Sequence, residues 1–167
     1  MSNRVPEPQH PNVQRVVDAA AGAGLAIEVV RFPSGTRTAE DAARAVGCSV
    51  AQIVKSLVFV VDGRPVVALV SGADRLDPAR LAAAMRAAHV RRAGGDEVRA
   101  ATGYAIGGVP PLGHLQPLPI LIDQRLLSFE QVWAAAGLPD AVLSVAPLAL
   151  ERAARARRAQ LASDASA

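Results

Sequence analysis

The sequence predicts a single α/β domain in which helices surround a mixed, largely antiparallel β-sheet. Segments whose apolar residues recur at helical spacing interleave with segments in which apolar residues alternate or run together. The Asp62-Gly63 pair between two apolar segments indicates a tight hairpin, so at least two strands are antiparallel. With 167 residues, 51% of them hydrophobic, the chain is long enough to bury one core.

The ends of the chain are expected to lie outside this domain. Residues 1–11 contain three prolines and no hydrophobic periodicity, which is typical of a flexible tail. We expect the folded domain to span residues 12–161 and residues 162–167 to form a second flexible tail. The first elements predicted within the domain are a helix from its cap at Asn12 to Gly22, a strand over 25–32 and a loop over 33–37.

The segment after this loop contains the longest predicted strand. Thr38, followed by Asp41 three residues later, indicates a helix N-terminus, and Gly47 ends that helix. Ser49 to Gln52 repeats the pattern and leads into a strand that begins near Lys55. Because side chains alternate along a strand, two sets face opposite ways: Lys55, Leu57, Phe59 and Val61 on one face, and Ser56, Val58 and Val60 on the other.

The second half of the chain alternates in the same way. Asp77-Pro78 marks a helix start, since Asp caps a helix and Pro favours its first turn. Segment 104–119 is too rich in glycine and proline for regular structure, and segment 127–136 fits either a helix or a strand. The other predicted elements are strands over 66–71, 89–92, 118–123 and 141–145, and helices over 78–88, 95–103 and 147–161.

Several classes of protein are excluded by what the sequence lacks. No apolar run reaches the roughly 20 residues of a membrane span, and no signal peptide is evident, so we expect a cytoplasmic location without membrane contact. The single Cys48 cannot form an internal disulfide, and neither a zinc motif nor a cofactor motif is present, so no metal or cofactor is expected. The motifs of serine hydrolases, P-loop proteins and dinucleotide-binding folds are also missing.

Lys55 is the only lysine, since the other seventeen of the eighteen Lys and Arg residues are arginine. A lysine carries a compact ammonium on a flexible stem, whereas arginine presents a rigid planar fork, so the two are not interchangeable in a confined site. The alternative is that Lys55 simply extends its charged end into water from a strand edge.

Five motifs occur in a consistent order between about Thr38 and about Leu150. Together they resemble the YbaK family, the free-standing relatives of the editing domain inserted in bacterial prolyl-tRNA synthetase. The motifs are Gln52-Ile-Val-Lys-Ser-Leu-Val-Phe59, Arg75-Leu-Asp77, Thr102-Gly-Tyr104, Gly107-Gly-Val-Pro-Pro-Leu-Gly113 and Leu118-Pro-Ile-Leu-Ile-Asp123.

This resemblance implies a partly barrel-like sheet and an aminoacyl-tRNA deacylase that hydrolyses the ester between a wrong amino acid and the terminal adenosine of a tRNA. The implied partner is a mischarged tRNA, tRNA-Pro or a related one, contacted at its acceptor end. An aminoacyl-tRNA synthetase is a second candidate partner. In the family, a GxxxP loop, here Gly107 to Pro111, surrounds the ester, and the lysine, here Lys55, lies at the nucleotide end.

Three residues are therefore predicted to be catalytic: Lys55, Gly107 and Gly108. Two successive glycines let the backbone approach a ligand closely, so that their N–H groups can stabilise a developing oxyanion. The predicted substrate-binding residues are Val109, Pro110, Pro111, His114 and Asp123. For the loop residues the alternative is an ordinary rigid turn. For His114 it is a surface histidine, and for Asp123 it is a solvated carboxylate at a strand end.

The amino acid that is removed stays open among Ala, Cys, Ser, Thr and a non-protein amino acid. Ser56 stands where alanine-removing relatives carry Asn, and Gly137-Leu-Pro-Asp140 replaces a glycine-rich segment of cysteine-removing relatives. Two arginine groups, Arg91-Arg92 and Arg152 to Arg158, are candidates for contact with tRNA phosphates, and the alternative for the second group is a solvated helix face. A non-catalytic module that binds tRNA or a synthetase, and a general hydrolase of small esters, are the alternative functions.

Overall fold

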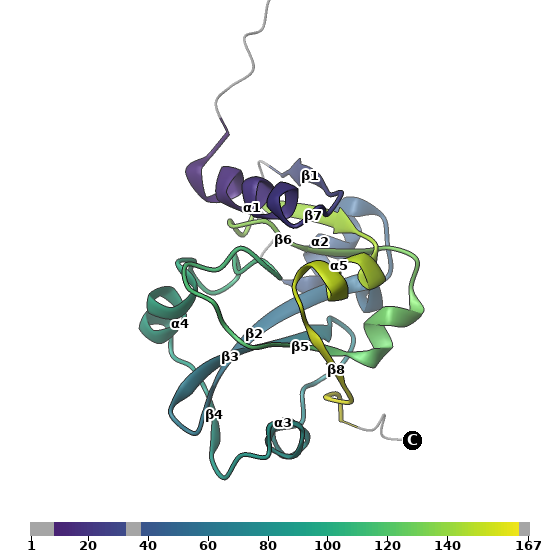
Figure 1. Cartoon of the computed structure of the whole chain (residues 1–167). Helices are drawn as coiled ribbons and strands as arrows, with labels where there is room; N and C mark the ends of the chain where they lie inside the picture. Colours follow the sequence, from purple (N-terminus) through teal and green to yellow (C-terminus); the bar gives the residue numbers. More distant parts are fainter. Residues whose placement is uncertain (1–8, 33–37, 164–167) are drawn as a thin grey trace, which may run out of the picture.

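The computed structural model describes residues 9–32 and 38–163, and the predicted loop over 33–37 and most of the two predicted tails lie outside this part (Figure 1). The described helices are α1 (Pro11–Gly22), α2 (Ala39–Val46), α3 (Pro78–Met85), α4 (Gly95–Thr102) and α5 (Pro147–Ala153), with 3-10 helices η1 (Val50–Gln52) and η2 (Gln124–Ser128). The described strands are β1 (Glu28–Arg31), β2 (Ile53–Val61), β3 (Arg64–Ser71), β4 (Val90–Arg92), β5 (Ile120–Asp123), β6 (Val132–Ala135), β7 (Ala141–Val145) and β8 (Arg157–Ala159).

The strands form one mixed sheet, which confirms the predicted fold class. Its order within the described residues is β1-β7-β6-β2-β3-β5-β8, and β4 pairs with β2 outside this path. Four of these pairs are antiparallel and three are parallel. Strand β2 hydrogen-bonds to β3, β4 and β6, so it holds the centre of the sheet.

The two faces of β2 pack into two different hydrophobic cores, as its alternation predicts. Val54 and Val58 belong to the larger core, which also contains α1 and strands β6 and β7. Phe59 and Val61 belong to a smaller core that includes Leu81 of α3. Figure 1 shows these helices at opposite ends of the molecule, α1 (purple) above β7 and α3 beside β4. Lys55 and Ser56 therefore face different layers.

Local signals in the sequence explain several element boundaries. The Thr38 hydroxyl accepts a hydrogen bond from Asp41 N–H at 3.0 Å, and Gly47 ends α2 with a left-handed conformation (φ 76°), as predicted. Asp62 and Gly63 both have positive φ, 47° and 82°, which is the conformation of a two-residue hairpin between β2 and β3. Segment 127–136, which fitted either class, contains strand β6.

The predicted boundaries of α1 and of the C-terminal helix are wrong, and the helix predicted over 78–88 ends at Met85. The α1 cap is His10 rather than Asn12, because the His10 ring accepts the Asn12 N–H and Pro11 takes the first helical position. The C-terminal helix predicted over 147–161 ends at Ala153, where Arg155 adopts a left-handed conformation (φ 51°). Residues 157–159 instead form β8, which pairs in parallel with β5, so tertiary pairing overrides the helical preference of an Ala- and Arg-rich run.

No helix in the described ranges is both long enough and apolar enough to cross a membrane.

Asp123 ties the end of β5 to the C-terminal segment. Its side chain is 2% exposed, and one carboxylate oxygen accepts the Arg125 N–H at the start of η2. The other oxygen accepts the N–H groups of Leu161 and Ala162, each at 2.8 Å. The sequence predicts that Asp123 either binds substrate or is solvated. In the structure, Asp123 is instead buried and accepts three backbone hydrogen bonds.

We expect Asp123→Ala to lower the free energy of unfolding by about 3 kcal/mol, because it leaves three N–H groups without their acceptor, two of them buried. Urea denaturation of both proteins measures the change. Asp18→Ala, at an exposed carboxylate on α1 that accepts the Gln14 amide, is the matched control and should change stability by about 0.5 kcal/mol or less. A similar effect of both substitutions would contradict this role.

Candidate active site

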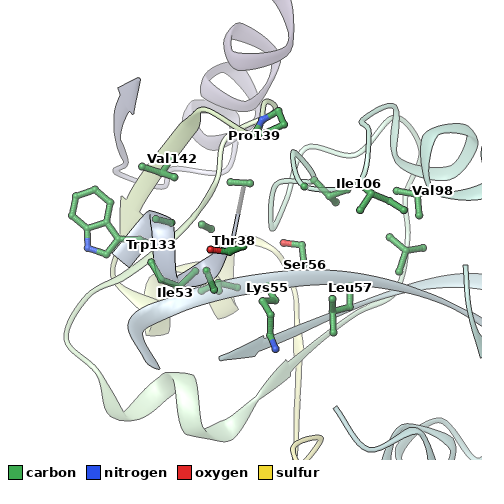
Figure 2. Close-up of a pocket in the computed structure, with 18 of the residues that line it drawn as sticks. Thr38, Ile53, Lys55, Ser56, Leu57, Val98, Ile106, Trp133, Pro139 and Val142 are labelled. Atoms are coloured by element: carbon green, nitrogen blue, oxygen red, sulfur yellow. The ribbon is translucent and has the colours of Figure 1, made fainter. Parts of the chain in front are cut away.

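A cavity of about 300 Å³ lies beside the central strand β2, on the side of the larger core (Figure 2). Its walls come from α2 and the residue before it, from β2, from β4 and α4, from the loop that follows α4, and from β6, β7 and the turn between them. The described lining residues are Thr38, Ala39, Ala42, Ile53 to Val58, Arg92, Ala93, Val98, Ile106, Gly107, Val109, Trp133 to Ala135, Pro139 and Val142.

The lining is mainly aliphatic, with few polar side chains. Among the described lining residues, the polar or charged side chains are Thr38, Lys55, Ser56, Arg92 and Trp133, and there is no carboxylate, imidazole or thiol. The Thr38 hydroxyl already accepts the N–H that caps α2. The cavity therefore suits a small, mainly apolar group, with cationic side chains at its edge.

Two of the five residues in the predicted Gly107 to Pro111 loop line the cavity, namely Gly107 and Val109. Neither of their N–H groups donates to an acceptor within the described residues, whereas Gly108 N–H donates to Ala105 O at 2.9 Å. A Cβ on Gly108 would lie 3.1 Å from Gly137 O, so this glycine allows close approach of the β6–β7 turn. Gly107 and Val109, rather than both glycines, thus present free donors.

The two prolines of the predicted loop and His114 do not line the cavity but lie close to residues that do. Pro110 and Pro111 are buried and lie outside the lining, and His114 Nε2 donates to Pro110 O at 2.8 Å. Helix α1 braces the same loop, because the Arg15 guanidinium lies 5.5 Å above the Tyr104 ring. The Tyr104 hydroxyl in turn donates to Gly113 O. His114 therefore holds the loop in shape, and Asp123 lies elsewhere.

Lys55 lines the cavity edge, but its ammonium points away from the cavity interior. Figure 2 shows the Lys55 ammonium and the Ser56 hydroxyl on opposite sides of the β2 ribbon. The half-buried Lys55 ammonium donates to the backbone oxygen of Asp74. Burial lowers the pKa of Lys55, and the Asp74 carboxylate opposes this shift. The catalytic roles of Lys55, Gly107 and Gly108 stay predictions.

Ser56 is a cavity residue that sequence reasoning assigned to the neighbouring layer. Its Oγ is buried and has no hydrogen-bond partner among the described residues. The alternation along β2 correctly predicts that Ser56 faces away from Lys55. It could not show that the cavity lies on the Ser56 side, because that depends on loops distant in sequence.

The two arginine groups differ in what they contact. Arg91 pairs with Glu97 at 2.7 Å, and Arg158 pairs with Glu151 at 2.8 Å. Arg92 lines the cavity, is exposed, and lies close enough to Lys55 to act on its charge. Of these arginines, Arg92 is the one placed to meet an anion beside the cavity. No group of three or more His, Cys, Asp or Glu residues within the described part is arranged to hold a metal ion.

The site is thus a small, mainly aliphatic cavity in an α/β domain, with Lys55 and Arg92 among its described lining residues. The chain belongs to the aminoacyl-tRNA editing domain family, whose sequence profile matches residues 33–153. This match covers most of the chain and confirms the resemblance that the five motifs carry. Editing of aminoacyl-tRNA is therefore the class of function to which the fold and sequence assign it.

Individual relatives agree with this assignment. Proline–tRNA ligase of Acidithiobacillus ferrooxidans is 36% identical over 116 residues, which cover 70% of this chain and 20% of the ligase. The chain thus spans about a fifth of the length of the ligase it matches. The uncharacterized protein YwhH of Bacillus subtilis is 29% identical over 120 residues, covering 72% of this chain and 76% of YwhH.

A solved structure resembles the chain over almost its whole length. It is described as a candidate trans-editing enzyme for prolyl tRNA synthetase, and it is 43% identical with a TM-score of 0.88. The similarity covers 93% of this chain and 99% of the other.

We expect Ser56→Ala to raise the free energy of unfolding by about 1 kcal/mol, because it removes a buried hydroxyl that has no partner among the described residues. Ser71→Ala is the matched control, since the Ser71 hydroxyl donates to Ala51 O at 2.7 Å, and its loss should lower stability by about 1 kcal/mol. Thermal and urea unfolding measure both. If Ser56→Ala destabilised the protein as much as Ser71→Ala, the Ser56 hydroxyl would have a partner in solution.

His114 should make the stability depend on pH. Burial lowers the pKa of His114 below its ordinary value, so the unfolded chain binds this proton more readily than the folded chain does. The stability that follows from keeping His114 neutral in the folded state is fully present above the ordinary histidine pKa of about 6.5. It is lost as the pH falls from that value through the lower pKa of the folded state.

His114→Gln keeps a donor for Pro110 O but cannot titrate. The free energy of unfolding of this variant should therefore change less between about pH 7 and pH 5 than that of the wild type. This range lies around the ordinary histidine pKa of about 6.5. Urea unfolding at a series of pH values compares the two slopes. Parallel curves would show that His114 does not cause the dependence.

Proposed function

We propose that this protein is a trans-acting editing deacylase that hydrolyses the ester of a mischarged amino acid on a tRNA. The observation that carries the proposal is the small apolar cavity in an editing-domain fold, lined by Lys55 and by Gly107 and Val109, whose N–H groups have no acceptor among the described residues. The nearly complete match to a candidate trans-editing enzyme supports action in trans.

The cavity explains how such a substrate would be oriented. A small amino-acid side chain is held by the aliphatic lining, which includes Val54, Val58 and Val142. The nucleotide end then lies at the cationic edge, where Lys55 and Arg92 attract the phosphates of the acceptor end. The substrate is thereby fixed at both ends of the ester bond.

The chemical step needs a water molecule, a stabilised oxyanion and a leaving group. Water attacks the ester carbonyl, and the N–H groups of Gly107 and Val109 stabilise the negative charge that develops on the carbonyl oxygen. The bond to the ribose oxygen then breaks, this oxygen takes up a proton, and a free amino acid and an uncharged tRNA result. Because the described lining contains no carboxylate or imidazole, the 2′-hydroxyl of the substrate itself positions the water.

A separate hydrolytic site of this kind has a physical reason. A synthetase pocket discriminates against one missing methylene by only about 1–3 kcal/mol, so amino acids smaller than the intended one are attached at times. The similarity to proline–tRNA ligase makes tRNA-Pro the first tRNA to test and a prolyl-tRNA synthetase the first partner to test. Such a reaction takes place in the cytoplasm, where aminoacylation occurs.

A panel of mischarged tRNAs tests the function. The purified protein is incubated with tRNA-Pro carrying Ala, Cys, Ser, Thr, a non-protein amino acid of similar size, or Pro, and loss of the ester is followed against buffer alone. We expect at least one small amino acid to be released and Pro to be retained. Binding of tRNA without hydrolysis of any ester would instead support the accessory binding module, and hydrolysis of free aminoacyl esters as fast as aminoacyl-tRNA would support a general esterase.

Lys55→Ala should lower kcat/KM for deacylation by about 100-fold, because the substrate loses the charge that holds its nucleotide end. Circular dichroism should show an intact fold, since Lys55 is only half-buried. Arg64→Ala, at an exposed position at the far end of the β2–β3 hairpin, is the control and should keep full activity. Unchanged turnover in Lys55→Ala would remove Lys55 from the site.

A further inference from the structure

The turn that follows β3 is fixed rigidly to the start of β2. Gly72 N–H donates to Ile53 O at 2.7 Å, and the Ser71 hydroxyl donates to Ala51 O at the same distance. A Cβ on Gly72 would lie 2.7 Å from Val50 O, so only glycine allows this close approach. Asp74, two residues later, is therefore held at a defined place beside Lys55.

Asp74 offers oxygen atoms to two cations. Its backbone oxygen accepts the hydrogen bond from the Lys55 ammonium, and its Oδ1 pairs with Arg125 Nη1 at 2.6 Å. The Asp74 side chain is 9% exposed, whereas that of Arg125 is 54% exposed. The second carboxylate oxygen, Oδ2, is buried and has no donor among the described residues.

A buried carboxylate oxygen without a donor destabilises a fold, so its presence needs a reason. The charges that act on Lys55 give a reason for this buried oxygen. Arg75 and Arg92 repel the ammonium, Glu40 attracts it, and Asp74 is the strongest attractive charge. Burial and the two arginines lower the pKa of Lys55, and Asp74 is the strongest of the charges that oppose them.

We propose that Asp74 is a positioning residue for Lys55: its backbone oxygen accepts a hydrogen bond from the ammonium and its carboxylate attracts it, so that the ammonium is held in place beside β2. Arg125, which shares the carboxylate, moderates this effect. The consequence for catalysis rests on the proposed deacylase function, whereas the effect on Lys55 itself does not.

The single lysine makes a direct test possible. Protein labelled with ¹³C-lysine gives one lysine signal set, and its chemical shift against pH reports the titration of Lys55. We expect Asp74→Asn to lower the pKa of Lys55, because it removes the attractive charge and keeps the shape of the side chain. Asp77→Asn, in the same segment at the cap of α3, is the matched control and should leave the titration unchanged.

A second variant gives a shift of opposite sign. Arg125→Gln removes the cation that neutralises Asp74, so the pKa of Lys55 should rise. Because Arg125 is exposed, this variant should fold even where Asp74→Asn does not. An unchanged Lys55 titration in both variants, or a rise in Asp74→Asn, would overturn the proposal.

The catalytic consequence is measured separately with the ester that the wild type hydrolyses. In Asp74→Asn, kcat/KM should fall by about tenfold, mainly through a higher KM, because Lys55 no longer holds the nucleotide end. A shifted titration with unchanged kcat/KM would also overturn the positioning role. If the wild type hydrolyses no ester, the proposed function fails, and the lysine titration alone decides whether Asp74 holds Lys55.

Discussion

The structure depends on the position of β2 at the centre of the sheet. Because this strand has neighbours on both edges and a different core on each face, its side chains must alternate between two layers. The same alternation divides the polar groups of the site. Ser56 is turned toward the cavity, and Lys55 is turned toward Asp74 on the other side of the strand. Neither side chain could move to the other layer without shifting the whole strand by one residue.

The central elements could be predicted because their signals are local. The alternation over 53–61, the Asp62-Gly63 hairpin and the cap at Thr38 each depend on residues within a few positions of one another. The approach of the Gly107 loop to the same cavity as Lys55 followed from a family resemblance, and the structure brings the two together. Within the described residues, the N–H groups of Gly107 and Val109 have no acceptor, whereas that of Gly108 donates to Ala105 O.

The features that could not be predicted depend on contacts between distant residues. Strand β8 forms because β5 offers it an edge, which nothing in its own Ala- and Arg-rich sequence indicates. Asp123 is buried because it accepts N–H groups from Leu161 and Ala162, far along the chain. The Ser56 hydroxyl, which has no hydrogen-bond partner in the described part of the chain, is equally unpredictable from sequence, since its surroundings come from other elements.

Helix α1 lies before the segment that the family profile matches, yet it contacts both loops beside the cavity. Arg15 covers Tyr104 at the start of one loop, and the Asn12 side chain donates to Gly137 O in the other at 3.2 Å. A helix that contributes none of the described lining residues thus supports both loops beside the cavity. Substitutions on α1 therefore change the support of both loops while every residue that lines the cavity stays the same.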